Sequence, residues 1–287
     1  MASIETFLYC SRRIAIVGRG AVGTAIYRSL EPYISENDLK VDCYHSENID
    51  EVFGKHYDLA IYAGVRAFKG AAEANPTADL MHILKAADTF KRISASRKIL
   101  ISTIDAGLPD EEITAYGRNR RLLEELVSDS FAKTRILRLP ALFGSTVTKN
   151  TWYDMMIGPE NVKLNKSLED EINLENRPGE RNINILSKTG DASKFVWFNL
   201  DTILEALARI IDLEKIHLAV SYDDAYKDGM LIRHHSLKEI LGYGDVHQSH
   251  SYKSINYSTA LTSQCVMFIK TPIAIDEVDH WKRVIKK

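Results

Sequence analysis

The stretch Arg13-Ile-Ala-Ile-Val-Gly-Arg-Gly-Ala-Val-Gly23 decides the fold of this chain of 287 residues. An apolar run over 14–17 stops at Gly18, and apolar side chains recur at helical spacing beyond Gly20, which predicts a strand, a tight turn and a helix. Gly18 permits the turn, Gly20 lets a pyrophosphate approach the backbone, and Gly23 lets the helix lie close to the strand. Unpaired amides at the start of that helix favour an anion. The pattern predicts a dinucleotide site rather than a turn that merely packs, and its residues are Gly18, Arg19, Gly20, Ala21, Val22 and Gly23.

Composition narrows the class of protein further. A formal net charge of -2, with 26% charged residues, gives no bulk attraction to nucleic acid or to an anionic membrane. The three cysteines, Cys10, Cys43 and Cys265, are far apart and form no Cys-x-x-Cys pair, which predicts a reducing compartment and no structural zinc. Residues 1–12 carry no signal-peptide pattern, and no stretch reaches the roughly 18 to 20 apolar residues of a membrane span. We therefore expect a cytoplasmic protein that binds no membrane.

Strands and helices alternate along the first half of the chain. This alternation predicts an α/β protein with a doubly wound parallel sheet and right-handed crossovers. The expected strands after the first are 39–44, 58–63, 98–102 and 135–139, and the two long amphipathic helices are 77–94 and 116–131.

The pattern changes after Gly144. Residues 150–195 are polar and irregular, and we expect them to form loops over a substrate cleft. A strand at 195–198, a helix at 203–211 and a strand at 217–220 then predict a return to the sheet. The expected division is a dinucleotide-binding domain over 1–145 and a lobe over 146–287 that mainly binds substrate, with about 195–220 returning to the first domain. A short capped helix from Ser236 and a strand at 266–269 complete the prediction.

Ligands bind at the carboxyl ends of parallel strands, so residues just after each strand are site candidates. We expect the cofactor to meet Ala63, Gly64 and Val65 after one strand and Pro140 and Leu142 after another.

The turn after the second strand is expected beside the adenosine ribose. An acidic residue about 20 positions beyond the glycines commonly accepts the ribose hydroxyls, and Asp42 lies near that distance. Asp42 falls inside the strand, however, whereas the turn itself offers His45, Ser46 and Glu47. The choice between NAD and NADP is open on these residues, and Asp42 can equally be an ordinary strand residue.

Three further segments carry a resemblance to a known family: Ile101-Ser-Thr-Ile-Asp105, Tyr116-Gly-Arg-Asn-Arg120 and Ile136-Leu-Arg-Leu-Pro-Ala-Leu-Phe-Gly144. In order and spacing they resemble the short-chain dehydrogenase/reductase superfamily, in the extended or atypical branch that includes nucleotide-sugar epimerases, dehydratases and reductases. The resemblance covers about 13–145 and part of 195–211. It implies a Rossmann-type sheet with a smaller C-terminal substrate lobe, bound NAD or NADP, and catalysis by a Ser or Thr and by the tyrosine of a Tyr-x-x-x-Lys motif.

Two departures from that family stand in the sequence. The glycines are spaced Gly-x-Gly-x-x-Gly rather than Gly-x-x-Gly-x-x-Gly, and Arg120 occupies the position of the lysine. Tyrosine has an ordinary pKa of about 10, so a nearby cation is needed for it to exchange a proton near neutral pH. Arginine supplies the charge, but it does not release a proton. We expect Tyr116 as acid/base, Arg120 as its electrostatic partner and ribose ligand, and Thr103 or Ser102 as the hydroxyl that bonds the substrate oxygen.

Each assignment has an ordinary structural alternative. Tyr116 and Arg120 can be a surface pair at i and i+4, and Ser102 and Thr103 can cap a strand end. His234 and His235 are adjacent with no third ligand nearby, so no metal site is expected. Surface charge is the default for three further cations that could meet a substrate phosphate, Arg66, Lys69 and Arg177.

The predicted function is an NAD(P)-dependent oxidoreductase or epimerase acting on a hydroxyl or keto group of a small molecule, in the first place a nucleotide-linked sugar. A non-catalytic NAD(P)-binding sensor or scaffold, and a reductase of a non-sugar metabolite, are the alternatives. The resemblance also implies a homodimer formed through the helices at 77–94 and 116–131.

Overall fold

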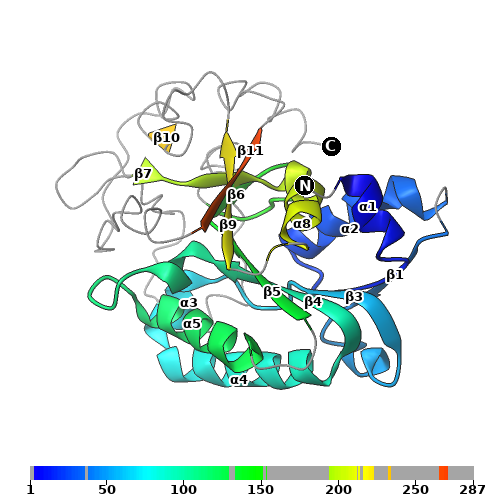
Figure 1. The fold of residues 1–287 in the computed structure, drawn as a ribbon. Helices are drawn as coiled ribbons and strands as arrows, with labels where there is room; N and C mark the ends of the chain where they lie inside the picture. Colours follow the sequence, from blue (N-terminus) through cyan, green and yellow to red (C-terminus); the bar gives the residue numbers. More distant parts are fainter. Residues whose placement is uncertain are drawn as a thin grey trace.

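A seven-stranded parallel sheet lies at the centre of the structure (Figure 1). The computed structural model describes residues 3–35, 38–128, 133–150, 153, 194–211, 213, 216–222, 232–233 and 265–270. The strand order is β11-β9-β5-β4-β3-β1-β2, and every neighbouring pair is parallel. The strands are β1 (Arg13–Val17), β2 (Lys40–Tyr44), β3 (His56–Tyr62), β4 (Ser94–Thr103), β5 (Lys133–Leu139), β9 (His217–Tyr222) and β11 (Cys265–Lys270).

Helices cover both faces of this sheet (Figure 1). One apolar core joins the sheet to α1 (Ile4–Tyr9), α2 (Ala21–Ile34) and α8 (Ile203–Ile210). A second core lies on the opposite face, beneath α4 (Pro76–Arg92) and α5 (Ala115–Ser128), with the short α3 (Lys69–Ala74) beside them. Because both faces of the sheet are covered, residues 14–17 of the central strand β1 are all apolar and all buried.

Short elements complete the described structure. Single 3-10 turns are η1 (Ile49–Val52), η2 (Ile104–Gly107) and η4 (Leu200–Thr202). β6 (Ala141–Phe143) pairs in parallel with β8 (Trp197–Asn199), and β7 (Lys194–Phe195) pairs antiparallel with β10 (Ile232–Arg233).

The predicted α/β class with a doubly wound, Rossmann-like sheet is confirmed. β4 starts four residues earlier than the predicted 98, because the chain enters it directly after α4 ends at Arg92. α2 contains Pro32 and continues to Ile34. Residues 1–12, in which no element was predicted, contain α1, whose N-cap Ser3 accepts a hydrogen bond from the amide of Thr6. The helix predicted from Ser236 lies outside the described residues, as does most of 150–195.

Candidate active site

The glycine turn lies where the order of the strands reverses. The chain runs from β1 to β2 on one side and returns to β3 on the other, and this switch point is where open α/β sheets bind ligands. The Gly18 amide donates to the Tyr44 carbonyl (2.8 Å), and the Ala63 amide donates to the Val17 carbonyl (2.7 Å). The turn is therefore fixed against the ends of both neighbouring strands.

The three glycines differ in what surrounds them. Gly18 has φ +115°, and a Cβ there would collide with the Ala63 carbonyl. A Cβ on Gly23 would overlap the Gly18 carbonyl, so Gly23 brings α2 against the turn. A Cβ on Gly20 would meet no protein atom within 4 Å, so the space beside it is open. Gly20 is also the N-cap of α2 and offers no side chain to the first amides. Such a turn fits a dinucleotide pyrophosphate.

The acidic residue predicted near the adenosine ribose, Asp42, does not lie at the end of β2. Asp42 pairs with Ala15 in the middle of the sheet register, two residues before β2 ends. Its carboxylate accepts a hydrogen bond from the Tyr57 hydroxyl (2.8 Å) and lies 3.8 Å from the Arg13 guanidinium. Within the turn that follows, the backbone amide of His45 donates to Asn48 Oδ1 (2.7 Å), and Ser46 is exposed.

Tyr116 lies in the first turn of α5 and is only 7% exposed. Its amide donates to Glu73 Oε1 (3.0 Å), which joins α3 to the start of α5. The next residue is Gly117, where a Cβ would lie 2.7 Å from the Asp105 carbonyl, so α5 packs directly on η2. Burial raises the pKa of Tyr116 to about 12; the Arg120 charge and a Thr103 hydrogen bond lower it, and the charges of Asp105 and Asp79 raise it.

A short polar chain links Thr103, the last residue of β4, to Lys69 at the start of α3. The Thr103 hydroxyl donates to Asp105 Oδ2 (3.1 Å) and also accepts from the Asp105 amide (3.3 Å). Lys69 Nζ donates to Asp105 Oδ1 at 2.6 Å. Lys69 is 28% exposed and Asp105 9%, so the chain runs from the buried tyrosine toward solvent.

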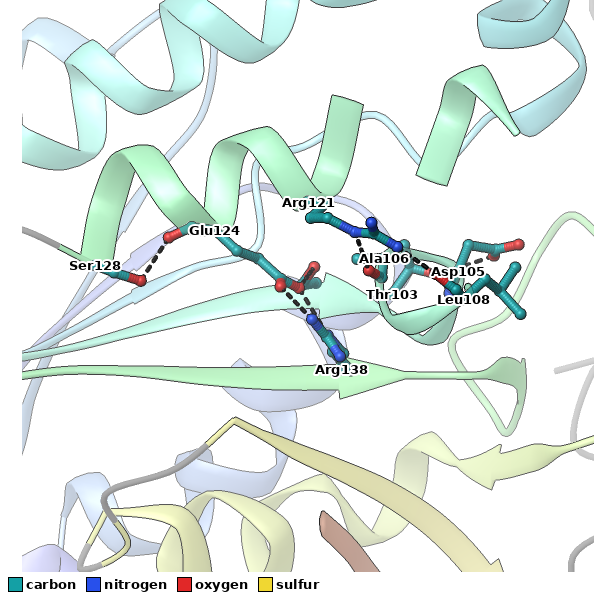
Figure 2. A network of polar contacts seen from close by, with 9 residues as sticks. Thr103, Asp105, Ala106, Leu108, Arg121, Glu124, Ser128 and Arg138 are labelled. Carbon is teal, nitrogen blue, oxygen red and sulfur yellow. Dashed lines mark hydrogen bonds and ion pairs between the residues drawn. The ribbon is translucent and has the colours of Figure 1, made fainter. Parts of the chain in front are cut away.

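Ser102 takes part in another network, and Figure 2 shows the Glu124 and Arg138 side chains of that network. Its hydroxyl donates to Glu124 Oε1 (2.6 Å), and Arg138 on β5 binds the same carboxylate through Nε (2.9 Å) and Nη2 (2.5 Å). One turn before Glu124, Arg121 donates from Nε to the Ala106 carbonyl (2.9 Å), as Figure 2 shows. Of the two hydroxyls offered by the sequence, Thr103 is the one associated with Tyr116.

Arg120 is 3% exposed and lies against Tyr116, with Cζ 4.1 Å from the centre of the phenol ring. Both terminal nitrogens bind protein: Nη1 forms an ion pair with Asp79 of α4, and Nη2 donates to the Arg66 carbonyl (2.6 Å). Arg120 thus lies beside the tyrosine, as expected of an electrostatic partner. Its guanidinium also binds α4 and the segment after β3.

The remaining candidates lie at the same sheet edge. Ala63, Gly64 and Val65 follow β3 directly. Pro140 follows β5, and Leu142 lies in β6. Sequence reasoning missed Glu73 and Asp79. A signal for Asp79 existed, because it falls at helical spacing on the buried stripe of α4 with Ile83, Ala86, Ala87 and Phe90.

Within the described residues, no group of three or more His, Cys, Asp or Glu side chains is arranged to hold a metal ion. His234, His235 and Arg177 lie outside that part of the chain. No helix of the described part combines the length and apolar character that crossing a membrane requires.

Comparison with known proteins gives a likeness in structure alone. No protein-family model matches the chain, and no curated protein matches its sequence. An epimerase from Methanothermobacter thermautotrophicus superposes with a TM-score of 0.64 at 12% identity, over 97% of this chain and 93% of that one. UDP-glucose 4-epimerase from Thermotoga maritima, solved with UDP-glucose, gives 0.60 at 14% identity over 96% and 98%. UDP-glucose 4-epimerase from Thermus thermophilus, solved with NAD, gives 0.61 at 13% identity over 96% and 99%.

The chain has the fold of these epimerases. The superposition covers nearly the whole length of this chain and of each epimerase. The resemblance expected from three short segments is therefore confirmed at the level of fold. At identities this low, a shared fold does not by itself carry an activity.

Proposed function

We propose that the chain is an NAD(P)-dependent oxidoreductase or epimerase that acts on a hydroxyl or keto group of a nucleotide-linked sugar. One observation carries the proposal: the hydroxyl-bearing side chains of Thr103 and Tyr116 come together at the end of β4, on the sheet edge that also bears the open turn at Gly20. Solved structures of the same fold contain NAD or UDP-glucose, which supports the choice of cofactor and substrate class.

The chemistry divides between cofactor and protein. A nicotinamide held by the glycine turn would supply or accept the hydride. Tyr116 is protonated at neutral pH, because its pKa is about 12, and it is therefore ready to donate a proton to a substrate oxygen that gains negative charge. Thr103 orients that oxygen, and Arg120 over the ring favours the phenolate that remains. Tyr116 as donor fits reduction of a keto group, including the keto stage of an epimerisation.

The test uses purified protein with NAD(H) or NADP(H) and a panel of UDP-hexoses and their 4-keto derivatives. Turnover is followed by cofactor absorbance and by chromatographic separation of the sugar nucleotides. Tyr116→Phe is expected to reduce kcat by about 10²- to 10⁴-fold and to change cofactor affinity by less than about twofold. Tyr27→Phe on α2 is the control, since that partly buried tyrosine lies outside the site. A Tyr116→Phe enzyme with full turnover would remove the acid/base role.

A second candidate is a non-catalytic NAD(P)-binding sensor or scaffold. It is favoured by the ion pair of Arg120 with Asp79, which commits the cation beside Tyr116 to an internal partner. This candidate predicts cofactor binding by the wild-type protein without turnover of any sugar nucleotide or simple ketone. Turnover of ketones but not of sugar nucleotides would instead support a reductase of a non-sugar metabolite.

The predicted homodimer belongs to the same proposal. On α4, Met81 is 62% exposed and Leu84 is 42% exposed, so this helix presents apolar surface away from the core. Light scattering tests the prediction: we expect a dimer for the wild type and a monomer for Met81→Glu/Leu84→Glu. A wild-type monomer would contradict it.

A further inference from the structure

The turn after β2 is suited to a phosphate rather than to two ribose hydroxyls. In dinucleotide folds an acidic side chain near this point binds the 2′-hydroxyl of NAD, whereas a nearby arginine accommodates the 2′-phosphate of NADP. The position of acidic and basic side chains here therefore bears on which coenzyme is used.

Asp42 is turned toward an internal partner. Side chains at positions 42 and 44 lie on the same face of β2, and Tyr44 packs into the core beneath α4 and α5. The Tyr44 and Tyr57 hydroxyls are 2.6 Å apart, and the Tyr57 hydroxyl donates to Asp42 (2.8 Å). The Asp42 carboxylate is thus held by this tyrosine pair, two residues before the strand ends.

Glu47 is the other acid near the turn. Its side chain is 86% exposed, and its carboxylate lies 3.8 Å from His45 Nδ1. The Glu47 amide also donates to His45 Nδ1 (3.4 Å). The first two residues beyond β2, His45 and Ser46, both offer hydrogen-bond donors and no negative charge.

Arg19 supplies positive charge at the same place. It stands in the glycine turn, its side chain is exposed, and it makes no hydrogen bond or ion pair with the described residues. Gly18, the preceding residue, is bonded to the Tyr44 carbonyl, so the two turns are adjacent. Burial and the charge of Asp42 raise the pKa of the Cys43 thiol, and the Arg19 charge lowers it, as expected for a guanidinium near the end of β2.

We infer that Arg19, with His45 and Ser46, binds the 2′-phosphate of NADP(H), so that this chain prefers NADP(H) to NAD(H). The inference rests on the proposed function, since it requires a dinucleotide in the glycine turn. Arginine matches the planar, multiply charged phosphate through two parallel donors, and the donors of the turn complete its coordination. The Thermus thermophilus epimerase of the same fold was solved with NAD, so this preference would set the chain apart from that protein.

Binding measured by calorimetry, with no substrate present, tests the inference. The probes are NADP⁺, NAD⁺, 2′,5′-ADP and 5′-AMP, at one fixed salt concentration. We expect NADP⁺ to bind at least about tenfold more tightly than NAD⁺, and 2′,5′-ADP more tightly than 5′-AMP by a similar factor, since a charge-assisted hydrogen bond contributes about that much. The two adenosine fragments isolate the effect of the phosphate from that of the nicotinamide.

Variants assign the effect to residues. Arg19→Ala should weaken NADP⁺ binding by about tenfold or more and change NAD⁺ binding by less than about twofold. Ser46→Asp should weaken NADP⁺ through repulsion and leave or improve NAD⁺ binding. Arg28→Ala is the matched control, because this exposed arginine lies on α2, five residues beyond Gly23. All three side chains are exposed, so the variants are expected to fold.

The outcomes separate this inference from the proposed function. NAD⁺ binding as tightly as NADP⁺, or more tightly, overturns the NADP preference and leaves the dinucleotide site in place. Equal loss of both coenzymes in Arg19→Ala assigns Arg19 to the pyrophosphate and also overturns the inference. If neither coenzyme binds the wild-type protein, the proposed function itself fails.

Discussion

The two ends of the candidate site are built on opposite principles. At the nucleotide end, the glycine turn is shaped by backbone, Gly20 faces open space, and Arg19 is uncommitted among the described residues. At the tyrosine end, Tyr116 and Arg120 are buried, and Arg120 is held by Asp79. One end is ready for a ligand, whereas the other has its charges paired with one another.

Substitutions at the open positions of the glycine turn should therefore act on ligand binding, and substitutions around Tyr116 and Arg120 should act on the stability of the fold. A buried charge is tolerated only when it is paired, so removing one partner leaves a desolvated ion and destabilises the fold. The open turn at Gly20 contains no buried charge, so a methyl group added there should obstruct the ligand without destabilising the fold in this way.

The largest effect is expected within the glycine turn itself. Gly23→Ala should destabilise the fold by roughly 4 kcal/mol or more, because the new Cβ overlaps the Gly18 carbonyl and only backbone movement can relieve it. Gly20→Ala should cost about 1 kcal/mol or less, since φ −78° suits alanine and no protein atom is near. Its coenzyme affinity should nevertheless fall about tenfold or more. Chemical denaturation and calorimetry measure the two quantities; equal stability losses in the two variants would refute the contrast.

The next effect concerns the buried ion pair between α4 and α5. Asp79→Ala should destabilise the protein by about 3 to 5 kcal/mol, because it leaves the Arg120 guanidinium buried with no counter-charge. Asp88→Ala on the same helix removes an exposed partner of Arg92 and should cost less than about 0.5 kcal/mol. Urea unfolding midpoints compare the two. If Asp79→Ala is as mild as its control, the tyrosine end is not held by this pair.

The sequence predicts the nucleotide end better than the tyrosine end for a physical reason. The Gly18 to Gly23 pattern is local, since the strand, turn and helix that it specifies are neighbours in the chain, and all three are found. The partner of Arg120 lies 41 residues before it, on another helix, and i,i+4 spacing on α5 does not reveal that contact. The adjacent hydroxyls have different partners, because Ser102 bonds Glu124 and Thr103 bonds Asp105. Which partner each hydroxyl meets depends on the alternation of side chains along β4 and on the three-dimensional packing.

The C-terminal half illustrates the same limit. Apolar runs correctly predicted β9 and β11. They did not predict that β9 pairs with β5 and β11 with β9, because the order of parallel strands depends on crossovers and not on local periodicity. α1 was missed since six residues carry too little helical periodicity to read, although Ser3 is an ordinary N-cap.

Alkaline pH tests the burial of the tyrosine end with a smaller effect. Burial raises the pKa of Tyr116 and that of Tyr62 to about 12, above the value of about 10 in an unfolded chain. The folded state therefore retains protons that the unfolded state loses, and its stability is complete below pH 10 and falls as pH rises from 10 to 12. Each group contributes a slope of about 1.4 kcal/mol per pH unit in that window.

Replacing either tyrosine by phenylalanine should flatten this decline. Unfolding free energies at several pH values for Tyr116→Phe and Tyr62→Phe give the slopes. Tyr9→Phe is the control, because Tyr9 is 74% exposed and should leave the slope unchanged. An unchanged slope in Tyr116→Phe would mean that the phenol is accessible to solvent in the folded protein.

The smallest effect separates Lys69 from the rest of the tyrosine end, since it alone among these charges is substantially exposed. Lys69→Gln keeps much of the side chain but removes the charge 2.6 Å from Asp105. Partial exposure limits the stability cost to about 1 kcal/mol. The Asp105 charge, which raises the pKa of Tyr116, then acts without this counter-charge, so the phenolate of Tyr116 should form at higher pH than in the wild type. Asp105→Asn should shift it the opposite way. Phenolate absorbance, taken as the difference from a matched Tyr116→Phe protein, measures both shifts; movement in the same direction in the two variants would show that Lys69 acts on Tyr116 by packing rather than by charge.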